Sequence, residues 1–82
     1  MKQNNSNIIS FEPVISSQIK ARGHKDNTLY LIFRNGKTYS YSPVTKEQYK
    51  EFKDAESAGA YFHTHFKMNS KLLIKQEDKL NK

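Results

Sequence analysis

The sequence predicts an α+β fold: a three-stranded antiparallel sheet with a central Asn-Gly hairpin, followed by two helices packed on one face. Two observations predict this architecture. Asn35-Gly36 separates two runs of strand-forming residues, and such a dipeptide is a strong short-range signal for a hairpin. Helix-capping patterns appear after residue 43. A chain of 82 residues has room for one small domain and a small core.

Three strands are expected before residue 43. Residues 14–22 alternate in character and are interpreted as the first strand, and residues 23–27 are rich in turn formers. Residues 28–33 and 38–42 form the two arms of the hairpin. Asn35-Gly36 suits a two-residue turn, because both of its residues tolerate a positive φ.

A two-residue turn also predicts which residues share a face of the sheet. It places Ile32 opposite Tyr39 and Leu31 opposite Ser40. One face would then carry Tyr30, Ile32, Tyr39 and Tyr41, and the other Leu29, Leu31, Phe33, Thr38 and Ser40. The helices can cover only one of these faces. The other is expected to be covered by a terminus or a partner, or to remain in contact with water.

Two helices are expected after Pro43, which cannot donate to a sheet ladder. Thr45 and Gln48 match a capping box for a helix that runs to about Ala55. The buried stripe of this helix is expected to consist of Tyr49, Phe52 and Ala55. Ser57 is a suitable N-cap for a second helix, whose apolar side contains Tyr61, Phe62, His65 and Phe66.

Two alternatives remain open after Lys67. Lysines recur every four residues from Lys67 to Lys79, and in a continuous helix they would form one basic stripe beside Leu73 and Leu80. Like charges at this spacing weaken a helix, so a disordered basic tail is the other alternative. The predicted organisation is therefore a flexible segment over 1–12, a domain over 13–67, and a basic amphipathic or disordered tail over 68–82.

The composition excludes some classes of protein. There is no cysteine, so disulfides and thiolate metal sites are excluded. The polar N-terminus has no apolar stretch typical of a signal peptide, and no apolar run is long enough for a membrane span. A cytoplasmic location is the resulting expectation.

Three blocks of residues resemble the KTSC domain family. The first block contains Val14, Ser16 and Ser17, and the second runs from Leu29 through Asn35-Gly36 to Val44. The third contains Ala55, Ser57, Gly59, Tyr61 and Phe62. The resemblance covers about residues 13–67 and implies a small α+β fold. The family takes its name from a position at the C-terminus of some lysyl-tRNA synthetases, and it also includes stand-alone bacterial and phage proteins. That association implies RNA binding and defines no catalytic residues.

The sequence offers little support for catalysis or for a metal site. His63 and His65 would point in different directions on a helix, and His24 lies far away in the sequence. No nucleophile elbow, phosphate-binding loop or paired-carboxylate pattern is present. We expect a protein that is not an enzyme and that has no metal and no cofactor.

The charge distribution favours a polyanionic partner. The net charge is +6, and the excess of lysine and arginine lies in residues 14–42 and 67–82. The leading hypothesis is a non-catalytic module that contacts RNA, or DNA, through basic and aromatic residues. The candidate residues are Lys20, Arg22, Arg34, Lys37, Tyr39, Tyr41, Lys67, Lys71, Lys75 and Lys79. The alternative is a protein–protein adaptor, such as a phage-encoded inhibitor of a host protein. It would use an exposed apolar sheet face or the amphipathic tail, and a homodimer is possible.

Overall fold

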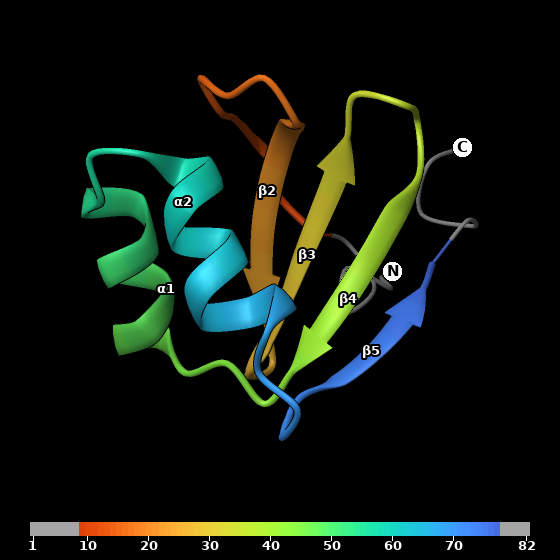
Figure 1. The fold of residues 1–82 in the computed structure, drawn as a ribbon. Coiled ribbons are helices and arrows are strands. Elements are labelled where there is room, and N and C mark those ends of the chain that lie inside the picture. Colours follow the sequence, from red (N-terminus) through yellow and green to blue (C-terminus); the bar gives the residue numbers. More distant parts are fainter. Residues whose placement is uncertain (1–8, 78–82) are drawn as a thin grey trace, which may run out of the picture.

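The computed structural model describes residues 9–77 and has two layers, with the helices lying on one face of a single sheet (Figure 1). The strands are β1 (Glu12–Pro13), β2 (Ile19–Lys25), β3 (Thr28–Phe33), β4 (Thr38–Ser42) and β5 (Leu73–Gln76). The helices are α1 (Lys46–Asp54) and α2 (Ala58–Phe62), and a π-helical turn (His63–Lys67) continues α2. Within residues 9–77, no helix has the length and apolar character that crossing a bilayer requires.

The α+β prediction is confirmed, with an antiparallel sheet and two helices. Within residues 9–77, however, the sheet has five strands in the order β1-β2-β3-β4-β5, and the prediction of three was wrong. The first long strand begins at Ile19, because the Ser16 hydroxyl accepts hydrogen bonds from the backbone N–H groups of Gln18 and Ile19 and turns the chain there. This strand then continues through the predicted loop to a tight turn at Asp26-Asn27, where both residues have a positive φ of 52° and 58°.

The continuous basic helix, one of the two alternatives considered after Lys67, does not form in residues 68–77. The Asn69 side chain accepts a hydrogen bond from the backbone N–H of Lys71, and this local bond replaces a helical one. Leu73–Gln76 then pairs with β4 as the edge strand β5. A strand also avoids stacking lysines at four-residue intervals, which is the repulsion that weakens the helix.

The predicted hairpin register was wrong by one residue. The turn has three residues: the Gly36 N–H donates to the Phe33 carbonyl, and Gly36 adopts a φ of 91°. Ile32 therefore pairs with Thr38, and Leu31 pairs with Tyr39. A one-residue shift moves every side chain of a strand to the other face. The observed register gathers the aliphatic and aromatic side chains under the helices: Leu29, Leu31, Phe33, Tyr39 and Tyr41.

The core lies between this face of the sheet and the helices. Leu29, Leu31 and Phe52 have no exposed surface, and Phe62 and Phe66 are buried against them. The two predicted caps are confirmed. Thr45 and Gln48 form the capping box of α1, and the Ser57 hydroxyl accepts from the Ala60 N–H at the start of α2. These caps orient the helices over β2 to β4, and Phe62 comes to face the sheet.

The opposite face of the sheet, called the outer face below, is partly covered by the N-terminal segment. Residues 9–11 lie against Gly23, where a Cβ atom would be 2.8 Å from Ile9 Cγ2 and 2.9 Å from the Ser10 carbonyl oxygen. Thr38 and Ser40 are also buried on this face, and the Ser40 hydroxyl donates to the Glu77 carboxylate. Leu29 and Leu31, which belong to one of the two faces considered for an adaptor, lie on the helix-covered side and have no exposed surface.

Candidate functional site

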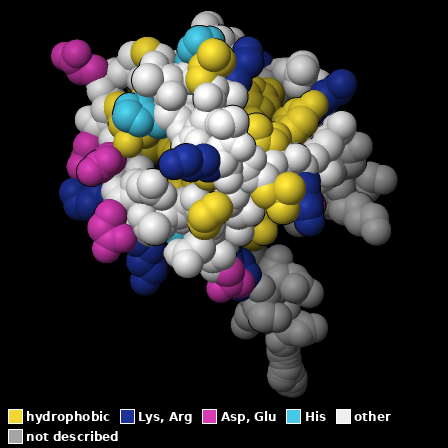
Figure 2. Space-filling model, turned by 60° about the horizontal axis from the view of Figure 1, so that its bottom comes forward, with side chains coloured by type: hydrophobic (Ala, Val, Ile, Leu, Met, Phe, Trp, Pro, Cys, Tyr) yellow, Lys and Arg dark blue, Asp and Glu magenta, His cyan; other side chains and the backbone are white. Residues whose placement is uncertain are grey.

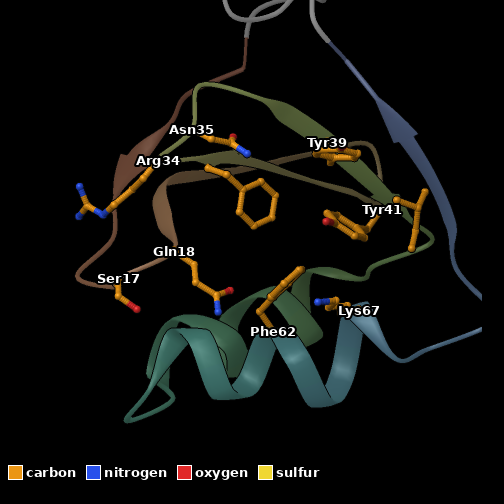
Figure 3. Close-up of a pocket in the computed structure, with 10 residues that line it drawn as sticks. Ser17, Gln18, Arg34, Asn35, Tyr39, Tyr41, Phe62 and Lys67 are labelled. Atoms are coloured by element: carbon orange, nitrogen blue, oxygen red, sulfur yellow. The ribbon is translucent and has the colours of Figure 1, made fainter.

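An open cleft of about 530 Å³ lies between the sheet and α2 (Figure 3). The helices cover β2 to β4, and β5 extends the sheet beyond them, so the helix-facing side of the last strands is only partly filled (Figure 1). The cleft is bounded by residues of the loop before β2, the β3–β4 hairpin, β4, α2, the π-helical turn and β5. Its volume is in the range of sites that take small organic groups.

Aromatic rings form the inner wall of the cleft. Phe33 lies edge-to-face against Tyr39 at 5.8 Å and against Phe62 at 5.5 Å. Tyr41 meets Phe62 in the same way at 5.7 Å. Burial raises the pKa of Tyr41, and neighbouring Tyr39 adds to the shift. Phe33 and Tyr39 are only half-buried, so their rings are the surfaces on which a planar ligand could stack.

The rim of the cleft is polar and positively charged. The ammonium group of Lys67 points into the cavity from the π-helical turn, and the Gln18 side chain points in from the opposite side (Figure 3). Ser17 and Asn35 add two further polar groups. No carboxylate belongs to the described residues that line the cleft. The electrostatics therefore favour an anionic ligand over a cationic one.

The structure brings four of the predicted site residues to the cleft: Arg34, Tyr39, Tyr41 and Lys67. Arg34 lines the cleft, but its charged group is not directed into it, as the predicted phosphate contact would require. Its guanidinium points away from the cavity (Figure 3), and its Nε donates to the Ser16 carbonyl oxygen at 2.8 Å. Arg34 therefore ties the hairpin tip to the loop before β2.

Arg22 takes part in internal packing. Its guanidinium lies 4.9 Å from the centre of the Phe52 ring, and its Nε is buried without a hydrogen-bond partner. The cation–π contact stabilises the packing of α1 on the sheet. A guanidinium in this position is poorly placed to contact an external phosphate.

The remaining lysines do not form a single stripe. Lys67 lies beside the cleft, whereas Lys75 pairs with Ser40 and shares the outer face with it. Lys20, Lys37 and Lys71 are exposed at the β2 bulge, at the hairpin tip and in the turn before β5. Lys79 lies outside the described residues. On the face shown in Figure 2, acidic side chains lie mostly toward α1, and exposed hydrophobic ones lie mostly toward β4 and β5.

Sequence reasoning missed the contribution of Gln18, Asn35 and Phe62 to this site. Gln18 was assigned to the middle of a strand, so its place at a turn was not visible in the pattern of apolar residues. Phe62 was correctly placed on the apolar side of the second helix, and its position opposite Phe33 depends on tertiary packing. Only the apolar character of Phe62 provided a signal.

The histidines are used in separate local contacts. His24 hydrogen-bonds through Nε2 to the Val44 carbonyl oxygen and stacks on Tyr49 at 5.0 Å. His65 stacks on Tyr61 at 4.0 Å. Across the described part of the chain, no three His, Cys, Asp or Glu side chains come together as a possible metal site.

Comparisons with known proteins identify the fold family. The family model of the KTSC domain matches residues 15–69. The crystal structure of the KTSC domain protein YPO2434 from Yersinia pestis is similar, with a TM-score of 0.75 and 30% sequence identity. The similarity covers 85% of this chain and 99% of that protein's chain. No match was found among curated proteins. The chain therefore belongs to the KTSC domain family.

Proposed function

We propose that this protein is a non-catalytic module that binds single-stranded RNA through the cleft. One observation carries the proposal. The half-buried rings of Phe33 and Tyr39 line the cleft, and the ammonium group of Lys67 lies at one of its openings. Unpaired RNA bases stack on aromatic side chains while cations contact the phosphates, and this is a common way of binding single strands.

The charge distribution supports the same proposal. The ion pairs of the described residues involve Lys25, Lys50 and Lys53, and the lysines exposed around the sheet take no part in them. These lysines are Lys20, Lys37, Lys67, Lys71 and Lys75. They would attract a polyanion at long range, and Lys67 would make the contact closest to the bound base.

The residues of the cleft favour binding over catalysis. General acid–base chemistry most often uses His, Asp or Glu, and none of these lines the cleft among the described residues. The titratable groups there are tyrosines and a lysine, together with an arginine that is engaged with the Ser16 carbonyl. Binding without turnover is the function that these groups suit best.

Fluorescence anisotropy tests the proposal. Labelled single-stranded RNA, tRNA and duplex DNA are titrated with protein at several salt concentrations. We expect single-stranded RNA to bind most tightly, with an affinity that falls steeply as salt rises. Lys67→Ala should lower the slope of log K against log salt by about one unit. Tyr39→Leu should weaken binding by about fivefold or more, because a stacked base contributes roughly 1–3 kcal/mol.

Lys75→Ala is the matched control. Lys75 is also exposed but lies on the outer face of the sheet, away from the cleft. We expect it to reduce affinity less than Lys67→Ala does. Equal losses in the two variants would mean diffuse attraction to a polyanion and no role for the cleft. An absence of binding at micromolar protein and low salt would refute the proposal.

A second candidate function is a protein–protein adaptor that uses the edge strand β5. Leu73 is 57% exposed and Ile74 is 43% exposed, so the strand at the sheet edge presents apolar side chains to solvent. Edge strands of this type can pair with another strand. Sedimentation analysis over a range of concentrations tests the version in which two copies pair. We expect a dimer that Leu73→Lys dissociates, and a monomer at every concentration would contradict this version.

A further inference from the structure

The backbone of Gln18 is held by hydrogen bonds to Ser16 and Arg34. The Gln18 N–H donates to the Ser16 hydroxyl at 3.1 Å, and its carbonyl oxygen accepts from the Arg34 N–H at 2.9 Å. The Arg34 side chain adds a third tie through the Ser16 carbonyl. The residue is thus anchored on both sides, between the loop before β2 and the hairpin tip.

The carboxamide of Gln18 makes no hydrogen bond to the described residues, and Figure 3 shows it directed toward Phe62 inside the cleft. A carboxamide on an anchored backbone, with a donor and an acceptor that no described residue occupies, is available to hydrogen-bond a ligand. The aromatic rings beside it would hold a planar group within its reach. This arrangement goes beyond non-specific stacking.

The chemistry of the rim points to one base. A carboxamide pairs with adenine by donating to N7 and accepting from the N6 amino group, whereas guanine is usually read by arginine or lysine and cytosine by a carboxylate. No carboxylate belongs to the described lining of the cleft, and the Arg34 guanidinium points away from it. The other cation of the described lining, Lys67, is assigned here to the phosphate. In single-stranded RNA this edge of the base is free, because it is neither paired nor hidden in a helix.

We infer that the cleft selects adenine among unpaired RNA bases, with the Gln18 carboxamide hydrogen-bonded to the base and Lys67 near its phosphate. This inference rests on the proposed function, because it concerns the same site. Arg34 and Ser16 act as positioning residues for Gln18 and do not touch the ligand.

A set of uridine heptamers with a single central adenosine, cytidine, guanosine or uridine tests the inference by anisotropy. We expect the adenosine heptamer to bind about fivefold or more tightly than the other three, as one bidentate contact allows. Gln18→Met should remove this preference, so that the adenosine heptamer binds no more tightly than the all-uridine heptamer. The substitution preserves the backbone hydrogen bonds and replaces an exposed side chain, so the fold should be unchanged in circular dichroism.

Gln48→Met is the control, because Gln48 is an exposed glutamine that does not line the cleft. Its side chain belongs to the capping box of α1, so the substitution should cost some stability. It should leave the preference for adenosine unchanged. Equal binding of all four heptamers would overturn the inference while leaving the proposed function in place. A preference for guanosine would overturn it as well and would point to Lys67 as the reader. If no heptamer binds, the inference and the proposed function fail together.

Discussion

Replacing Gly23 with alanine tests how the outer face of the sheet is covered. Gly23 lies in β2, and the N-terminal segment passes close to its Cα atom. An added Cβ would be 2.8 Å from Ile9 Cγ2, 2.9 Å from the Ser10 carbonyl oxygen and 3.3 Å from Phe11 Cδ1. The two side chains can move aside, but the carbonyl oxygen belongs to the backbone. Residues 9–11 would therefore have to shift away from the sheet.

The magnitude follows from two opposing effects. Overpacking of this type typically costs about 1–3 kcal/mol. Replacing a glycine within a strand recovers roughly 0.5–1 kcal/mol, because the unfolded chain loses conformational freedom. We expect a net loss of about 1–2 kcal/mol in the free energy of unfolding. For a domain of this size that loss lowers Tm by about 4 °C or more.

Gly59→Ala is the matched control for this measurement. Gly59 lies in α2, and among the described residues an added Cβ would meet only the Ser16 hydroxyl, at an ordinary contact distance of 3.6 Å. The better helix propensity of alanine should stabilise the protein by roughly 0.5–1 kcal/mol. Urea and thermal denaturation of both variants measure whether each substitution raises or lowers the free energy of unfolding. If Gly23→Ala stabilises the protein as Gly59→Ala does, residues 9–11 do not lie against β2.

Two further substitutions test the core and the aromatic wall of the cleft. Leu31→Lys should prevent folding, because Leu31 has no exposed surface and an unpaired charge there costs several kcal/mol; a folded variant by circular dichroism would contradict the register of β3. The pKa of Tyr41 is raised by burial, so the native state keeps this proton to a higher pH than the unfolded state. The contribution of Tyr41 to the free energy of unfolding is therefore fully present below about pH 10 and is lost as the pH rises above it. In urea titrations Tyr41→Phe should reduce this loss of stability at high pH. An unchanged pH dependence would refute the assignment.

Features that depend on neighbouring residues were predictable from the sequence. The capping box of Thr45 and Gln48 and the Ser57 cap involve atoms three residues apart, so the chain carries their whole description. The strands over 28–33 and 38–42 were also predicted with their observed bounds. The blocks of residues that resemble the KTSC domain are mostly made of such local signals, and the match to the family confirms that resemblance.

The register of the hairpin could not be read from the turn dipeptide. Asn-Gly suits a two-residue turn, but here Gly36 closes a three-residue turn, and the Asn35 side chain accepts a hydrogen bond from the Lys37 N–H. What favours this register is the burial of Tyr39 and Tyr41 together with Leu29 and Leu31. That gain depends on helices that lie many residues further along the chain.

The candidate site shows the same division. The aromatic and basic residue types were visible in the sequence, but Gln18 and Phe62 joined them only through the packing of a loop and a helix against the sheet. The lysines at four-residue spacing favoured one stripe, and the pairing of β5 with β4 placed Lys67 and Lys75 on different sides of the sheet. A strand alternates its side chains, whereas a helix aligns every fourth one.

By itself, the sequence determined the α+β class, the helix caps and the two hairpin strands, because each follows from interactions within a few residues. The tertiary structure alone decided the register, the edge strands β1 and β5, and the cleft. These features arise from contacts between segments far apart in the chain. Their free energies come from burying apolar surface and from pairing strand edges, and no local pattern of residues predicts these contributions.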